Sequence, residues 1–265
     1  MPQLSAIILA AGKGTRMRSD LPKVAHVVND RPMVNWVVEA CAQAGSTKIV
    51  VVVGYQRDVV KSCLAGVSYQ GVTIEYALQE EQLGTGHAVR SAEGCFKDLA
   101  GDTFVLAGDG PLIRAATLRT LLERHRSTGA SAALATSVIA DPSGYGRIVR
   151  DASGRFSAIV EEKHCTPAQK AVREVNPSYY CFRTAELFEC LRDVKRNEGS
   201  GEYYITDVPS LMLERGRRVE VIDAVPAEDV LSINTPEQLA EVDAVLRARE
   251  PRLASSGGAR SGGAR

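Results

Sequence analysis

A glycine-containing loop rich in cations is the first candidate site. It reads Leu9-Ala10-Ala11-Gly12-Lys13-Gly14-Thr15-Arg16-Met17, and Leu21-Pro22-Lys23 follows. Glycine lets the backbone approach a ligand closely and turn several N–H groups toward an anion, while Arg16 and Lys23 add fixed positive charge. The combination predicts polyphosphate binding, although a glycine turn with two surface cations is an equally good interpretation of the loop alone. Neither common phosphate motif fits, because Walker A ends in Gly-Lys-Ser/Thr and the dinucleotide fingerprint needs glycine where Met17 stands.

Two more polar segments come after expected strands. After the strand expected at 72–77 comes the segment Gln79-Glu80-Glu81-Gln82-Leu83-Gly84-Thr85. Its glutamine amides can pair with the imide face of a pyrimidine. Asp109 follows the other strand, and a carboxylate opposite a phosphate-binding loop is a suitable magnesium ligand. Each segment also has a purely structural interpretation. The segment 79–85 would be a polar loop that Thr85 caps ahead of a helix, and Asp109 would be a turn residue.

Short β-branched runs alternate with longer amphipathic stretches in the first half of the chain. This pattern predicts an α/β fold, with a Rossmann-like, mixed but mostly parallel sheet flanked by helices. Because such sheets bind ligands at the carboxyl ends of their strands, we expect the polar segments to meet at one edge. Strands are expected at 5–9, 48–53, 72–77 and 103–106, and helices at 32–44 and 116–125.

The second half of the chain predicts a small antiparallel lobe. Its strands are expected at 131–139, 146–150 and 156–160, joined by short turns. A closing helix is expected at 235–249, with the Thr235 hydroxyl as its N-terminal cap. Helices at 183–191 and 205–215 and a strand at 218–222 complete the fold, and the low-complexity residues 251–265 predict a disordered tail.

Composition argues against several other classes of protein, although it leaves a local basic site possible. The chain has 265 residues with 32 Lys and Arg against 32 Asp and Glu, so overall charge does not steer it toward nucleic acid or an anionic membrane. No apolar run approaches the roughly 20 residues that cross a bilayer, and no basic region precedes the first apolar stretch. We therefore expect a cytoplasmic protein. The six cysteines form no C-x-x-C pair, which argues against a zinc knuckle or a redox motif.

An ordered series of later motifs points to one family. With these motifs, the chain resembles the nucleotidyltransferase domain of the GlmU family, which are bifunctional N-acetylglucosamine-1-phosphate uridylyltransferases and glucosamine-1-phosphate acetyltransferases. The resemblance covers about residues 4–245 and implies a fold of the nucleotide-diphospho-sugar transferase type. The motifs are, in order, Gly144-Tyr145-Gly146-Arg147-Ile148, Val160-Glu161-Glu162-Lys163, Glu174-Val175-Asn176, Glu202-Tyr203-Tyr204-Ile205-Thr206-Asp207 and Ile233-Asn234.

The resemblance implies a role for each motif. Arg16 and Lys23 would be catalytic, neutralising charge on the α-phosphate of UTP and on the departing pyrophosphate. Asp109 and Asn234 would coordinate one Mg²⁺, which prefers a few oxygen ligands. The nucleotide would be bound by Leu9, Ala10, Ala11, Gly12, Lys13, Gly14 and Thr15 on the phosphate side and by Gln79, Gln82, Gly84 and Thr85 at uracil; the sugar would be bound by Gly146 through its backbone, Glu161, Asn176, Tyr204 and Thr206.

The implied reaction makes UDP-N-acetylglucosamine, a precursor of cell-wall or surface polysaccharides, and pyrophosphate from UTP and N-acetylglucosamine 1-phosphate. In one departure from the family pattern, Pro177-Ser178 follows Asn176 where a small residue and glycine are usual, which leaves the exact sugar open. One alternative is a related enzyme for another sugar 1-phosphate or nucleoside triphosphate. An alternative of another class is a catalytically silent regulatory subunit that binds sugar nucleotides.

The resemblance also sets expectations for organisation. We expect a nucleotidyltransferase domain over 1–250, with a nucleotide-binding half at about 1–130, a sugar-binding half at about 131–228 and the closing helix at 235–249. No hexapeptide repeat of the kind that forms the family's acetyltransferase domain follows Asn234, so we expect a stand-alone or excised uridylyltransferase. A monomer with small-molecule substrates, and with no nucleic acid or membrane partner, is expected.

Overall fold

The protein is described here by a computed structural model that covers residues 3–96, 98–231 and 233–249. The expected disordered tail at 251–265 lies outside these residues. The strands are β1 (Leu4–Ala10), β2 (Val27–Val28), β3 (Arg31–Pro32), β4 (Lys48–Val53), β5 (Thr73–Leu78), β6 (Asp102–Ala107), β7 (Ala132–Val138), β8 (Gly146–Arg150), β9 (Phe156–Val160), β10 (Glu174–Arg183) and β11 (Val219–Asp223). The α-helices are α1 (Met33–Gln43), α2 (Arg57–Cys63), α3 (Thr85–Ser91), α4 (Ala115–Thr128), α5 (Pro167–Lys170), α6 (Thr184–Asp193), α7 (Val208–Glu214) and α8 (Pro236–Arg249).

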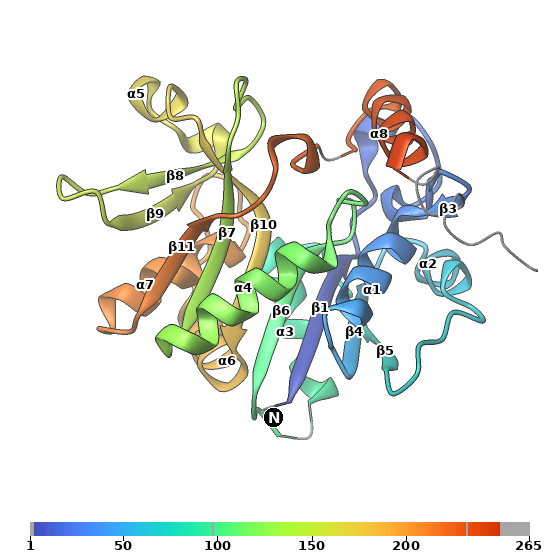
Figure 1. Cartoon of the computed structure of the whole chain (residues 1–265), viewed down its shortest axis with the longest axis horizontal. Helices are drawn as coiled ribbons and strands as arrows, with labels where there is room; N and C mark the ends of the chain where they lie inside the picture. Colours follow the sequence, from blue (N-terminus) through green and yellow to red (C-terminus); the bar gives the residue numbers. More distant parts are fainter. Residues whose placement is uncertain (1–2, 97, 232, 250–265) are drawn as a thin grey trace, which may run out of the picture.

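One mixed sheet organises the described residues. Its strands follow the order β11-β7-β10-β6-β1-β4-β5, and β8 pairs with both β10 and β9. Of these nine strands, β9 and β10 run opposite to the other seven, as the pairings of β10 with β6, β7 and β8 and of β8 with β9 show. The α/β fold with a mostly parallel sheet and a small antiparallel lobe is therefore confirmed (Figure 1).

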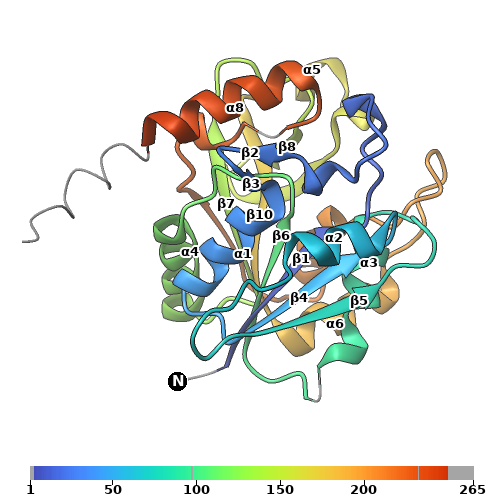
Figure 2. The ribbon, with the colours of Figure 1, turned by 90° about the vertical axis from the view of Figure 1, so that its right-hand side faces the viewer.

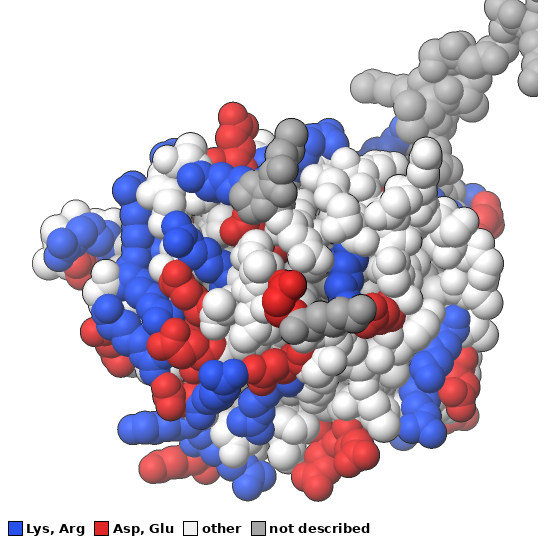
Figure 3. Space-filling model, turned by 90° about the horizontal axis from the view of Figure 1, so that it is seen from below, with Lys and Arg blue, Asp and Glu red and all other residues white. Residues whose placement is uncertain are grey.

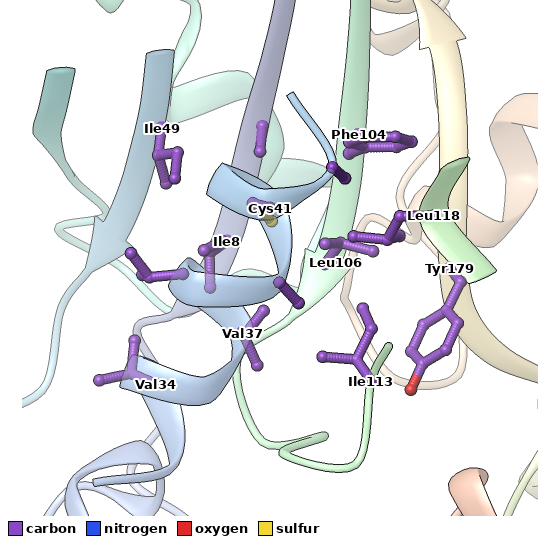
Figure 4. Close-up of a cluster of buried hydrophobic side chains, with 14 of the residues drawn as sticks. Ile8, Val34, Val37, Cys41, Ile49, Phe104, Leu106, Ile113, Leu118 and Tyr179 are labelled. Carbon is purple, nitrogen blue, oxygen red and sulfur yellow. The ribbon is translucent and has the colours of Figure 1, made fainter. Parts of the chain in front are cut away.

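Both faces of the sheet are buried, as the apolar character of its central strands requires. In β1, Ile8 packs in a cluster with α1 and α4, whereas the adjacent Ile7 points to the opposite face and packs with α6 and α7. Figure 4 shows the first cluster, in which Val34, Val37 and Cys41 of α1 lie against the strands. Val34, Val37, Val38 and Cys41 recur at helical spacing in α1 and are each fully buried. Gly45 adopts a φ of 100° just beyond the helix, where glycine is a common stop.

Strand β10 is the main element that the sequence pattern did not predict. It lies in the middle of the sheet although it contains Asn176, Pro177 and Ser178, which are residue types that strands disfavour. The pairing register of β10 with β7 shifts between Val175 and Tyr179, so the proline falls within a bulge, the place where a central strand tolerates it. Ser178 adopts a left-handed φ of 66° at this bulge.

Helix α8 closes the fold at the end where the parallel strands finish. It lies against β2 (Figure 2), and Val242 and Leu246 are buried in a cluster with Met17 and Ile233. The Thr235 hydroxyl accepts a hydrogen bond from the backbone N–H of Gln238 at 3.3 Å, which confirms the expected cap. The start of α8 is therefore fixed next to the loop that follows β1.

The other predicted elements differ from the structure mainly at their ends. The strands expected at 48–53, 146–150 and 156–160 have the predicted bounds, and the closing helix begins one residue later, at Pro236. In the described part of the chain, none of the helices has the length and apolar character needed to cross a membrane. The face at the amino ends of the strands carries Lys and Arg next to Asp and Glu (Figure 3), in keeping with the balanced composition.

Candidate functional site

The loop after β1 has the backbone geometry that a close approach requires. Gly14 adopts a left-handed φ of 70°, and a Cβ at this position would lie 2.5 Å from Cβ of Lys23. Gly12 and Lys13 are exposed, and Nζ of Lys13 lies 5.2 Å from the ring centroid of Tyr55. Only glycine fits at Gly14 without strain, so the loop can hold its cations close together.

Asp109 reaches the same edge of the sheet from β6. The backbone N–H of Gly108 donates to the carbonyl of Leu9 at 2.9 Å, and a Cβ on Gly108 would lie 2.8 Å from that oxygen. This close approach continues the pairing of β6 with β1 and places the next residue, Asp109, beside the end of β1. The carboxylate thus faces the cation-bearing loop, as the topology of a parallel sheet predicts.

Four predicted side chains meet at this point. Nζ of Lys23 contacts Oδ2 of Asp109 and donates to Oδ1 of Asn234 at 2.6 Å. Arg16 donates to the same Asn234 oxygen from Nη2 at 2.8 Å. The Lys23 and Asp109 side chains are only 15% and 20% exposed, so water and salt screen their attraction less than that of a surface pair. The two cations therefore share the Asn234 oxygen, and Lys23 also contacts the Asp109 carboxylate.

Asn234 is held in place by its neighbours in the chain. Its backbone N–H donates to Oε1 of Gln238 at 2.8 Å, and the preceding Ile233 is fully buried. In the described residues, no group of three or more His, Cys, Asp or Glu side chains is arranged around a metal-sized space. The Asp109 and Asn234 oxygens nevertheless both reach one ammonium group, so the two together suit a single small cation that takes its remaining ligands from phosphate and water.

The residues expected to bind the uracil base lie between β5 and the start of α3. Gln79 is 3% exposed, and its Nε2 lies 3.1 Å from the carbonyl of Gly84 and 3.1 Å from Nδ1 of His87. Gln82 is exposed, and its Nε2 donates to the backbone carbonyl of Gln79 at 3.4 Å. The Thr85 hydroxyl accepts from the backbone N–H of Ile205 at 3.0 Å. The structure therefore gathers these residues in one loop and uses Thr85 partly to anchor it.

The residues expected at the sugar gather on the antiparallel lobe. Gly146 of β8 is paired with Asn176 of β10, and Nδ2 of Asn176 donates to the hydroxyl of Tyr180 at 2.6 Å. The backbone N–H of Ser178 donates to Oδ1 of Asn176 at 3.2 Å, so its left-handed conformation helps to orient the amide. Tyr180 is fully buried, and burial raises the pKa of its phenol, which keeps the hydroxyl protonated.

Glu161 and Thr206, which are also among the residues expected to bind the sugar, lie in contact with each other. The hydroxyl of Thr206 donates to Oε1 of Glu161 at 3.0 Å. Burial and the nearby Glu161 carboxylate raise the pKa of Asp207. Next to Glu161, Glu162 forms an ion pair of 2.6 Å with Arg147, whose side chain is 1% exposed. Because a buried cation is costly without a partner, this pair fixes the backbone that carries Glu161.

The segment 202–205 connects the residues expected to bind uracil with those expected to bind the sugar. The Tyr203 backbone accepts from the N–H of Gly86 and donates to the carbonyl of Leu83, both at 2.8 Å. The Tyr204 hydroxyl donates to Glu202 at 2.7 Å and contacts Ser200 at 2.6 Å. Gly84 has a φ of 97°, and a Cβ there would lie 2.5 Å from the carbonyl oxygen of Tyr203. The two groups thus belong to one continuous arrangement.

Sequence reasoning missed three residues that orient the predicted ones. His87 contacts Gln79, Tyr180 contacts Asn176, and Arg147 pairs with Glu162. Arg147 stands inside a quoted motif, and His87 follows the quoted segment 79–85 by two residues, so their positions were a usable signal. Tyr180 had no such signal, because the bulge in β10 hides which residues share a face with Asn176.

The fold and the site together define a class of α/β protein that gathers cationic side chains, a carboxylate and an amide at the carboxyl edge of its sheet. The family described as nucleotidyl transferase matches residues 5–230, and the chain belongs to this family. The match spans the loop after β1, Asp109 and the antiparallel lobe.

Among curated proteins, the chain is similar to the bifunctional protein GlmU of several bacteria. It is 45% identical to that of Geobacter metallireducens over 94% of this chain and 52% of the relative. It is 46% identical to that of Pelotomaculum thermopropionicum over 93% of this chain, and 46% identical to that of Carboxydothermus hydrogenoformans over 90%. The resemblance inferred from the motifs is confirmed, and the chain spans about half the length of these relatives.

Proposed function

We propose that the chain transfers a uridylyl group from UTP to N-acetylglucosamine 1-phosphate and releases pyrophosphate. The observation that carries this proposal is the meeting of Arg16, Lys23, Asp109 and Asn234 at the carboxyl edge of the sheet, in a nucleotidyl transferase that is similar to GlmU proteins. A silent subunit that only binds sugar nucleotides would predict a damaged phosphate loop or a missing metal ligand, whereas Arg16, Lys23, Asp109 and Asn234 are all present.

In the proposed reaction, an oxygen of the sugar phosphate attacks the α-phosphorus of UTP in line with the bond to pyrophosphate, which breaks. The attacking oxygen is already ionised at neutral pH, so no general base is needed. The loop 11–15 holds the triphosphate through its backbone N–H groups, and Arg16 and Lys23 bring the two anions together. Both cations neutralise the charge that develops as pyrophosphate leaves.

Asp109 and Asn234 would hold Mg²⁺, whose preference for oxygen ligands fits this pair. When bound, the ion would neutralise phosphate charge and fix the geometry of the triphosphate. The Lys23 ammonium, which contacts both oxygens in this structure, would then be free to face the α-phosphate.

The remaining contacts complete the proposal. Gln79 and Gln82, with Gly84 and Thr85, would hold uracil, and Leu9 and Ala10 lead the chain into the phosphate loop. Sugar hydroxyl and acetamido groups would contact Gly146, Glu161 and Asn176, with Tyr204 and Thr206 on the sugar-phosphate side. We propose a nucleotide-binding half at about 1–130 and a sugar-binding half at about 131–228, both supported by the same sheet. A cytoplasmic location and a monomeric state stay predictions, and sedimentation equilibrium would test the latter.

The proposed function is tested by turnover with Mg²⁺, each of the four nucleoside triphosphates and a panel of sugar 1-phosphates, scored by pyrophosphate release. We expect release with UTP and N-acetylglucosamine 1-phosphate. Release with another sugar 1-phosphate and not with N-acetylglucosamine 1-phosphate would favour the related enzyme for another sugar. Binding of UTP with no release from any pair would favour the silent subunit instead.

Replacing Tyr180 by phenylalanine tests the sugar-side assignment. The change removes only the hydroxyl that accepts from Asn176, so the amide loses its fixed orientation. We expect the KM for the sugar 1-phosphate to rise about fivefold, the effect of one hydrogen bond, with the KM for UTP unchanged. Steady-state kinetics with each substrate varied in turn measures both constants.

The neighbouring Tyr179 provides a matched control. Tyr179 is also buried, but its side chain points to the other face of the sheet, and its hydroxyl lies 3.5 Å from the carbonyl oxygen of Asp229. Tyr179→Phe should leave the KM for the sugar 1-phosphate unchanged. Equal effects of the two substitutions would mean that Tyr180 does not act through Asn176.

A further inference from the structure

The orientation of the Gln79 amide is fixed by two different neighbours. Its Nε2 lies 3.1 Å from the carbonyl oxygen of Gly84, which has no proton to give, so the amide must present its NH₂ group on that side. The same Nε2 lies 3.1 Å from Nδ1 of His87. With the amide so oriented, Nδ1 accepts the second amide proton, and the neutral imidazole carries its own proton on Nε2.

The backbone positions of Gln79 and of both neighbours are fixed. The backbone N–H of Gln79 donates to the carbonyl of Val53 at 2.8 Å and extends the pairing of β4 with β5. Gly84 is held against Tyr203, where a Cβ would already collide, and His87 is part of α3. The Gln79 side chain, at 3% exposure, therefore has little room for the opposite orientation.

This orientation leaves Gln79 with one kind of contact to offer. Both amide protons are engaged, and no described residue donates a hydrogen bond to Oε1. Oε1 is thus an acceptor that needs a donor. Uracil carries a ring N3–H that supplies one, whereas the unprotonated N3 of cytosine would set two lone pairs against each other.

We propose that His87 is a positioning residue which, with the Gly84 carbonyl, holds Oε1 of Gln79 toward the base and so selects a pyrimidine with a ring N–H. The inference rests on the proposed function only in placing the base at Gln79. It assigns the discrimination between uridine and cytidine nucleotides to the acceptor Oε1, and not to the NH₂ group of the same amide.

The first test uses the unchanged protein. Titration calorimetry with UTP, CTP and 3-methyl-UTP, without sugar phosphate, measures binding in the absence of turnover. We expect UTP to bind at least tenfold more tightly than the other two, because each of the others lacks the N3–H donor and leaves Oε1 unpaired against the bound base. Equal binding of UTP and 3-methyl-UTP would overturn the proposal.

The second test addresses His87. His87→Ala should lower the UTP-to-CTP binding ratio about fivefold, and His87→Asn, which keeps an acceptor on the side chain, should restore much of it. Ser91→Ala is the matched control, because its hydroxyl bonds the backbone of His87 in the same helix without contact to Gln79. An unchanged ratio in His87→Ala would refute the role of His87.

The outcomes also separate this inference from the proposed function. Selective UTP binding without pyrophosphate release would contradict the transfer reaction and leave the base selection intact. Pyrophosphate release with UTP and CTP at equal efficiency would support transfer and contradict the role of Gln79.

Discussion

Replacing Lys23 by alanine should lower kcat about a hundredfold to a thousandfold while raising the KM for UTP less than tenfold. The Lys23 ammonium contacts both Asp109 and Asn234. In the proposed reaction, its charge is needed most when pyrophosphate departs. An interaction stronger in the transition state than in the bound substrate affects kcat more than KM. Initial rates over a matrix of UTP and sugar 1-phosphate concentrations separate the two constants.

Lys48 is a suitable control for the Lys23 variant. It is a lysine of nearly equal side-chain exposure, 16% against 15%, and it pairs with Glu75 at the opposite end of the sheet. Lys48→Ala should change stability without changing kcat at a temperature where the protein stays folded. A Lys23→Ala enzyme with normal kcat would show that this lysine has no part in the chemical step.

Replacing Asp109 by asparagine should produce opposite effects with and without Mg²⁺. With Mg²⁺, kcat/KM should fall about a hundredfold or more, since metal polarisation of a phosphoryl oxygen is worth several kcal/mol. Without Mg²⁺, UTP should bind about fivefold more tightly, because a carboxylate next to the triphosphate has been removed and Lys23 has lost its anionic partner. Turnover and metal-free calorimetry measure the two effects.

This reversal distinguishes a metal ligand from a residue that only stabilises the fold. Loss of a merely structural carboxylate would weaken UTP binding in both conditions. Asp193→Asn removes an exposed carboxylate that pairs with Arg215, away from the site, and should change neither quantity. If metal-free UTP binding weakens in Asp109→Asn, the proposed place of Asp109 beside the phosphates is wrong.

The residue pattern was sufficient to predict helices and strands whose buried residues recur at regular spacing or form one continuous run. The valines of α1 recur at helical spacing, and β4 is an apolar run bounded by polar residues, so each element was found almost to the residue. The contact between Lys23 and Asp109 was also predictable. Lys23 follows the loop after β1 and Asp109 follows β6, and these two strands are parallel neighbours in the sheet.

Other features depend on contacts that a linear pattern does not contain. Strand β10 was missed because Pro177 and Ser178 disfavour a strand unless a bulge accommodates them. The choice of Gly84 and His87 as partners of the Gln79 amide depends on where α3 begins relative to β5. Arg147 is buried only because Glu162, from beyond the next strand, neutralises it.

The contact between Lys23 and Asn234 joins residues 211 positions apart and has a consequence for the nascent chain. Synthesis proceeds from the N-terminus, so β1, β4, β5 and β6 are complete while Asn234 has yet to be made. Until α8 docks, Arg16 and Lys23 face Asp109 alone. Translation therefore delivers the loop after β1, Lys23 and Asp109 first and Asn234 last. Under the proposed function, the ribosome-bound intermediate should hold nucleotide well before it can transfer it.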